Sequence, residues 1–156
     1  MTVNIPEELR YFSPDSQAEL PASLSEYPYF RYELNGEKPW EQEKNGLPLL
    51  QEAWEQAVKQ LEEKQLARSK DVKEEVDTLL ALFFMALFWA NNQPAAPVLW
   101  MEKEPDLMVK PINFLERFTY IDSRPYTYMA YRQLIELMTE LKKASAVQLL
   151  KSSRRT

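Results

Sequence analysis

The sequence predicts an all-α protein, a single domain in which an orthogonal or bundle-like set of helices surrounds one buried central helix at about residues 71–92. Three observations predict this class. Twelve consecutive apolar residues run from Leu79 to Ala90, and a helix that is apolar on every side must be enclosed by other elements. Only two glycines occur in 156 residues, which argues against sheets with many tight turns. Several other stretches repeat apolar residues at helical spacing.

The central helix is too short to cross a membrane. Twelve helical residues extend about 18 Å, whereas a membrane span needs about 20 residues. Ser69 and Asp71 offer N-caps for this helix, and the run Asn91–Pro94 ends it. We therefore expect the apolar stretch to form the centre of a helical core and not a membrane anchor.

Three further helices and one shorter helical piece are expected around the centre. Proline is favoured in a first helical turn, so Pro48, Pro111 and Pro125 predict helices at about 48–67, over about ten residues from 111, and from 125 to about 150. Between them, the residues before Pro105 predict one or two helical turns. The apolar stripes are Leu50, Trp54, Ala57, Val58 and Leu61, then Phe114, Leu115, Phe118 and Ile121, then Ala130, Leu134, Leu137, Met138 and Leu141.

The first 47 residues predict an irregular arm with short helical pieces. One or two helical turns are expected after Pro6, followed by a loop over residues 17–26, and another short helical piece begins at Lys38. The aromatic run from Tyr27 to Leu34 has strand-like local signals, but no second alternating run follows to pair with it. We therefore expect an extended segment that packs across the helices through Tyr27, Phe30 and Leu34.

One domain, 1–156, is expected to comprise this arm (1–47), a helical core (48–150) and a frayed basic tail (151–156). All 24 acidic residues lie within the first 140 positions, together with 14 basic ones, although the net charge of the whole chain is only −5. An acidic body disfavours nucleic-acid binding. The basic end can contact phosphates, or it can complement the negative C-terminal end of its own helix.

Composition excludes several chemistries. Cysteine and histidine are both absent, so the chain has no disulfide, thiolate nucleophile, histidine base or zinc site of the usual ligands. No glycine-rich phosphate loop is present, and no cofactor is expected. The start shows no basic stretch followed by an apolar stretch, so a cytoplasmic location is expected.

One acidic pattern suggests an enzyme. Glu52 and Glu55 are followed, after 18 intervening residues, by Glu74 and Asp77, which resembles the paired acidic motifs of the all-α nucleoside-triphosphate pyrophosphohydrolases. The resemblance implies magnesium held by these four carboxylates. Two geometric points oppose it. Helical angles place Glu52 and Glu55 away from the apolar stripe of their helix, and antiparallel helices leave the two pairs about 9–18 Å apart. A solvated acidic face is the simpler interpretation.

Other candidates are aromatic and arginine side chains. The segment from Arg124 to Arg132 interleaves two arginines with three tyrosines at a helix start, a combination that can contact phosphates or bases or simply pack at a helix junction. Trp40 and Trp100 lie in irregular stretches, where a tryptophan either covers the core or anchors a partner. The interaction candidates are Tyr29, Trp40, Trp100, Arg124 and Arg132.

The aromatic segment from Tyr27 to Glu33, followed by Lys38, Pro39 and Trp40, resembles the YpoC-like proteins. These are small bacterial proteins with an aromatic segment, a Pro-Trp pair and then helices. The resemblance covers about the first third of the chain. It implies a cytoplasmic bacterial protein and supplies no catalytic residues.

The sequence thus favours a cytoplasmic, non-enzymatic module that binds a protein partner, and it indicates neither the identity of that partner nor the oligomeric state. One alternative is a magnesium-dependent nucleotide pyrophosphohydrolase that uses Glu52, Glu55, Glu74 and Asp77. Another is weak nucleic-acid binding through the basic C-terminal helix.

Overall fold

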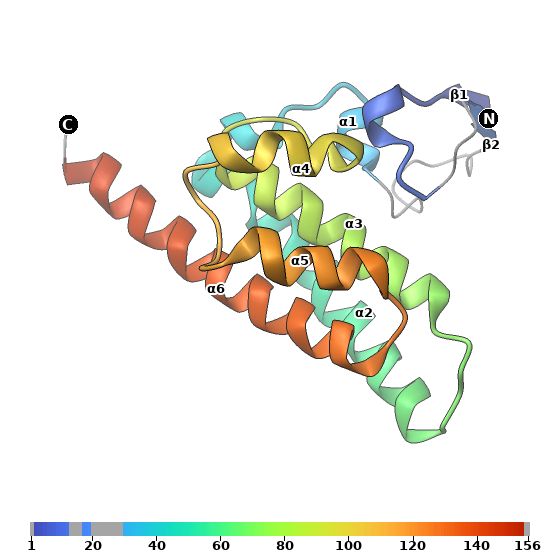
Figure 1. Ribbon diagram of the computed structural model, residues 1–156. Helices are drawn as coiled ribbons and strands as arrows, with labels where there is room; N and C mark the ends of the chain where they lie inside the picture. Colours follow the sequence, from blue (N-terminus) through green and yellow to red (C-terminus); the bar gives the residue numbers. More distant parts are fainter. Residues whose placement is uncertain (1, 13–16, 20–29, 155–156) are drawn as a thin grey trace.

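The structure, a computed structural model, describes residues 2–12, 17–19 and 30–154. Six α-helices dominate this part of the chain (Figure 1), so the predicted all-α class is confirmed. The α-helices are α1 (Arg31–Leu34), α2 (Pro48–Leu66), α3 (Lys73–Ala90), α4 (Trp100–Lys103), α5 (Phe114–Ser123) and α6 (Tyr128–Arg154). Short 3₁₀ turns are η1 (Glu7–Leu9), η3 (Pro39–Glu41), η4 (Glu43–Gly46), η5 (Pro97–Leu99) and η6 (Glu104–Asp106).

Helix α3 is the centre of the core, as predicted. All twelve residues from Leu79 to Ala90 are buried, and α3 packs against both α2 and α6. Aromatic rings connect it to α5, since Phe83 and Phe84 lie with their ring centroids 5.6 and 5.2 Å from that of Phe118. A fully buried leucine or phenylalanine contributes about 1.5–3 kcal/mol of transfer free energy, so this helix supplies much of the drive for folding. Within the described residues, no helix is long and apolar enough to cross a membrane.

The predicted apolar stripes of α2 and α6 face this core. Leu50, Trp54, Ala57 and Leu61 are buried on α2, and Ala130, Leu134, Leu137, Met138 and Leu141 are buried on α6. The tail was expected to fray from Lys151, but α6 continues to Arg154. The apolar side chains of Val147 and Leu150 near this end are exposed. The helix extends beyond the packed region because adding residues to an existing helix is easier than starting one, and because several of these residues have high helix propensity.

Helix α2 begins at Pro48, as predicted, whereas the starts of α5 and α6 lie slightly later than Pro111 and Pro125 predict. Helix α5 begins at Phe114, after Asn113 adopts a left-handed backbone with φ 55°. Helix α6 begins at Tyr128, where the Thr127 hydroxyl accepts a hydrogen bond from the Ala130 N–H at 3.2 Å. A threonine whose hydroxyl accepts a hydrogen bond from the backbone N–H three residues later is an N-cap. Thr127, and not Pro125, therefore sets the start of α6.

The start of α3 also differs from the prediction. Its N-cap residue is Val72, whose side chain makes no capping bond. The Ser69 hydroxyl instead accepts a hydrogen bond from the Asp71 N–H at 3.2 Å, within the link between α2 and α3. Both predicted caps therefore shape the turn before the helix, and neither caps the helix itself.

The N-terminal part contains more regular structure than the sequence predicts. Residues Thr2–Asn4 (β1) pair antiparallel with Gln17–Glu19 (β2), so part of the expected 17–26 loop is a strand. The expected extended segment is helical from Arg31 to Leu34. Phe30 is buried and Leu34 packs partly buried against the core, as predicted, whereas Tyr27 lies outside the described residues.

Polar contacts attach this N-terminal part to the helices. The Tyr11 hydroxyl donates a hydrogen bond to Asp122 at the end of α5, and its ring lies edge-on to Phe84 at 4.9 Å. Glu33 of α1 accepts hydrogen bonds from the indole N–H of Trp89 at 2.8 Å and the backbone N–H of Ala95 at 3.0 Å. The arm is therefore held by specific donors and acceptors as well as by apolar packing.

Candidate functional site

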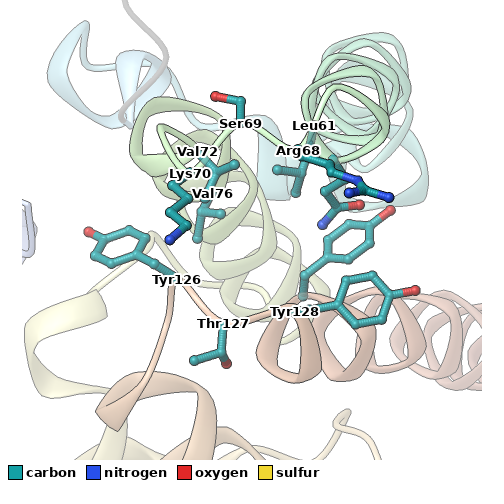
Figure 2. A pocket seen from close by; sticks show the side chains of 11 residues that line it. Leu61, Arg68, Ser69, Lys70, Val72, Val76, Tyr126, Thr127 and Tyr128 are labelled. Atoms are coloured by element: carbon teal, nitrogen blue, oxygen red, sulfur yellow. The ribbon is translucent and has the colours of Figure 1, made fainter.

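A cleft of about 560 Å³ opens where the link between α2 and α3 meets the α5–α6 junction. Its volume is in the range of ordinary ligand pockets. Figure 2 shows Lys70 and Tyr126 on one side of the opening, Arg68 and Tyr128 on the other, and apolar side chains of α2 and α3 between them. The lining residues are Leu61, Gln65, Arg68, Ser69, Lys70, Val72, Val76, Tyr126, Thr127, Tyr128 and Tyr131.

A buried carboxylate holds one wall of this cleft. Asp77 is only 2% exposed, and its two oxygens accept from the Tyr126 hydroxyl at 2.8 Å and the Lys73 ammonium at 2.6 Å. The Lys73 ammonium also lies 5.8 Å from the centroid of the Tyr126 ring. Burial, followed by the hydrogen bond to Asp77, raises the pKa of Tyr126. Tyr126 is therefore a protonated donor with a fixed orientation.

The opposite wall is fixed in a similar way. Tyr131 is buried, and its hydroxyl donates to Glu62 of α2 at 3.1 Å. Burial, together with the hydrogen bond and charge of Glu62, raises the pKa of Tyr131 to about 12. The ring of Tyr128 lies 6.1 Å away from that of Tyr131, and Tyr128 is 59% exposed. One tyrosine thus joins α2 to α6, while its neighbour presents a free aromatic face to the cleft.

Two basic side chains flank the opening. Arg68 and Lys70 are exposed, and in the described part of the chain neither forms an ion pair or a side-chain hydrogen bond. Arg68 also has a left-handed backbone, with φ 57°. Sequence reasoning missed both residues because a basic pair after a helix is an ordinary surface feature. The available signal was that the end of α2 lacks the glycine that usually occupies a left-handed C-terminal position.

Three carboxylates near the cleft are paired with donors. Besides Asp77 and Glu62, the buried Glu75 accepts from the Lys64 ammonium at 2.9 Å. The hydrogen bond to Glu75 raises the pKa of Lys64, against a smaller effect of desolvation. Asp71 and Glu74 are exposed nearby but do not line the cleft. Arg68 and Lys70 do line it and have no ion partner among the described residues, so they are the charges that an anionic group in the cleft would meet.

The four acidic residues of the pyrophosphohydrolase-like pattern do not converge in the structure. Glu52, Glu55 and Glu74 are exposed, whereas Asp77 is buried. Glu55 accepts a hydrogen bond from Gln51 at 2.7 Å, and both oxygens of Asp77 are used by Lys73 and Tyr126. Among residues 2–12, 17–19 and 30–154, no group of three or more acidic side chains is arranged to hold a metal ion. Asp77 acts instead as a positioning residue for the cleft.

The interaction candidates occupy different environments. Trp100 is buried, with its ring edge-on to Phe114 at 5.8 Å and Phe118 at 4.9 Å. Trp40 is partly buried and lies 6.5 Å from the Trp89 ring. Arg124 and Arg132 precede and follow the cleft tyrosines in the sequence. Both are exposed, and neither lines the cleft. Tyr29 lies outside the described residues.

A second cavity, of about 510 Å³, lies beside α1 and is lined in part by Trp40, Glu33, Lys38 and Lys103. The Glu33 Oε1 atom is buried and has no hydrogen-bond partner within the described residues. Burial raises the pKa of Glu33, and the hydrogen bonds from Ala95 and Trp89 oppose this effect. Ionising this carboxyl in the folded protein therefore costs free energy, and the hydrogen bonds from Trp89 and Ala95 hold the side chain in place.

A family model described as YpoC-like protein matches residues 44–153. This chain belongs to the YpoC-like family. A relative from Bacillus subtilis (strain 168), named "Uncharacterized protein YpoC", is 32% identical over 140 residues, which cover 86% of this chain and 85% of the relative. No solved structure matches the chain. The expected resemblance is confirmed, although the family match begins after the aromatic segment that suggested it and includes all the residues that line the first cleft.

Proposed function

We propose that this YpoC-like chain is a non-enzymatic protein-interaction module of the bacterial cytoplasm, and that it binds its partner at the α5–α6 junction. The observation that carries the proposal is the exposure of large side chains there. Tyr126, Tyr128 and Met129 are 45%, 59% and 61% exposed. They stand between the exposed Arg124 and Arg132. Tyrosine and arginine are enriched among the residues that dominate interface energies, and methionine is frequent at adaptable binding surfaces.

Rigidity supports a binding role for this surface. The Tyr126 hydroxyl is bound to Asp77 of α3, and the Tyr131 hydroxyl is bound to Glu62 of α2. These contacts fix the wall of the cleft to two helices that are themselves part of the core. A preorganised surface loses less conformational entropy when it binds, so more of the contact energy appears as affinity.

The chemistry of the cleft also favours binding over catalysis. Its two tyrosines with raised pKa values remain protonated at neutral pH and can donate hydrogen bonds, but they are poor general bases. The nearby carboxylates of Asp77 and Glu62 already accept hydrogen bonds from these tyrosines. The available groups are therefore donors, cations and aromatic faces, which suit recognition.

A pull-down from a bacterial lysate tests the proposal. We expect the tagged chain to retain a near-stoichiometric protein that survives nuclease treatment, and we expect Tyr128→Ala with Met129→Ala to lose it. Removing two exposed interface side chains of this size costs about 2–4 kcal/mol of binding free energy, which corresponds to a loss of thirtyfold or more. Unfolding temperatures should barely change, because both side chains are exposed.

The matched control changes two equally apolar positions elsewhere. Met108 and Ile112 are 85% and 76% exposed on the link between α4 and α5. The double variant Met108→Ala and Ile112→Ala should keep the partner. If the junction variant retains the protein and the control loses it, the interaction surface lies elsewhere and the proposal is wrong.

A further inference from the structure

We infer that the partner offers an acidic segment with an apolar or aromatic side chain, and that this segment lies in the cleft between Lys70 and Tyr128. The inference rests on the proposed function and adds to it the chemistry of the partner. Its support comes from the unpaired charges of Arg68 and Lys70 at the opening and from the apolar floor of the cleft.

The charged side chains at the cleft differ in whether they have partners. Glu62 accepts from Tyr131, and Asp77 accepts from Tyr126 and Lys73. Arg68 and Lys70 have no such partner among the described residues, and Figure 2 shows them on opposite sides of the opening. Asp71 follows Lys70 but does not line the cleft. A segment that enters between the two cations can therefore place carboxylates against both.

The end of α2 places Arg68 at the opening of the cleft. Arg68 lies just beyond the last residue of α2 and has a left-handed backbone, φ 57°, a conformation in which glycine is favoured. Two backbone hydrogen bonds hold this helix end, from the Arg68 N–H to the Gln65 carbonyl at 3.0 Å and from the Ser69 N–H to the Lys64 carbonyl at 2.9 Å. Glycine here would relieve the strain and remove the guanidinium, which forms bidentate bonds with carboxylates.

The floor and one wall of the cleft are apolar or aromatic. Leu61, Val72 and Val76 line it together with Tyr128 (Figure 2). Leu61 and Val76 are buried beneath the surface. An acidic segment gains little from charge alone in water, so the apolar floor supplies burial for a leucine or aromatic side chain of the same segment.

A short acidic segment fits this surface better than a nucleic acid does. The chain carries a net charge of −5, and Glu63 and Glu74 are exposed on the two helices that lead to the cleft. A long polyanion extends beyond the two cations and meets these acids, whereas a peptide can present its carboxylates within the cleft only.

Fluorescence anisotropy with defined peptides tests the inference on the full chain. One probe is a short fluorescein-labelled peptide of glutamates and leucines, and the other has every glutamate replaced by glutamine. We expect the acidic peptide to bind about tenfold more tightly, and we expect binding to weaken between about 50 and 300 mM NaCl. Equal binding of the two peptides, or binding of neither, would overturn the acidic character of the partner.

Three variants locate the binding. Arg68→Glu with Lys70→Glu should weaken acidic-peptide binding at least tenfold, whereas Lys143→Glu with Lys151→Glu, which changes net charge equally at exposed sites near the end of α6, should leave it within twofold. Arg68→Gly should raise the unfolding temperature and still weaken binding. Stronger binding of a single-stranded oligonucleotide than of the acidic peptide, or loss in the α6 variant alone, would contradict the inference.

The two proposals can fail separately. If the pull-down yields a partner that depends on Tyr128 and Met129 but the peptides do not distinguish charge, the interaction module stands and the acidic partner does not. If the pull-down is unaffected by the junction variant while the acidic peptide binds Arg68 and Lys70, the cleft is an anion site and the proposed interaction surface is wrong.

Discussion

Carboxylates in this protein hold aromatic side chains in place, and one of them, Asp77, is itself buried. Asp77 accepts from Tyr126, Glu62 accepts from Tyr131, and Glu33 accepts from the indole of Trp89. The cost of burying a charge is offset where such donors are present. These contacts lead to two predictions about single residues.

Tyr126→Phe should destabilise the fold by about 1–2 kcal/mol, because it removes a hydrogen bond to a buried carboxylate and keeps the ring. Chemical denaturation measures the change. The matched control is Tyr120→Phe, since Tyr120 is 40% exposed and its hydroxyl has no side-chain partner in the described region. The control should change stability by less than about 0.5 kcal/mol. Equal effects of the two substitutions would show that the Asp77 contact does not fix the cleft.

Glu33→Gln should change how stability depends on pH. Burial raises the pKa of Glu33 in the folded state, so its carboxyl binds a proton more tightly when folded than when unfolded. This contribution to stability is complete below the unfolded value and is lost as pH rises through the folded pKa. From the ordinary value of 4.5 upward, the wild type should lose stability relative to the glutamine variant. Parallel denaturation profiles of the two proteins across this range would contradict the prediction.

At the scale of elements, the spacing of apolar residues predicted those helices that bury an apolar side in the core. The apolar run of α3 and the stripes of α2, α5 and α6 identified the core because each helix buries one side or all sides. Leu115 of the α5 stripe is the exception, since it is 44% exposed. The starts of α5 and α6 were misplaced because prolines mark only the approach, while Asn113 and Thr127 set the first turn. The pairing of β1 with β2 joins residues 2–4 to 17–19, and so short a pair leaves too weak a local pattern to predict.

Two tryptophans differ in how deeply they are buried, and their replacement should therefore differ in its effect on stability. Trp100 is 3% exposed and packs on α5, so Trp100→Ala should cost about 3–5 kcal/mol. Trp40 is only partly buried beside Trp89, and its replacement by alanine should cost clearly less. Thermal unfolding measures both variants. If Trp100→Ala is the milder change, α4 is not anchored through its tryptophan as the structure shows.

At the scale of the whole molecule, the cleft joins segments that the sequence keeps far apart. The pattern of tyrosines and arginines after residue 123 was visible, and so was the composition that excludes histidine and cysteine chemistry. Arg68 and Lys70 could not be assigned to the same site, because their proximity to Tyr128 depends on how α2, α3 and α6 pack (Figures 1 and 2). Glu52 and Glu74, which belong to the acidic pattern that the sequence offered as an alternative metal site, are exposed, and no described group of three or more acidic side chains is arranged to hold a metal ion.

Hydrogen exchange on the full chain, alone and with the protein that it captures, shows whether the partner binds at the cleft. We predict that amides of residues 65–72 and 124–132 gain protection in the complex, because these segments form the cleft, and that amides of residues 106–112 do not. Protection confined to the α4–α5 link or to the end of α6, with the cleft segments unchanged, would contradict the account.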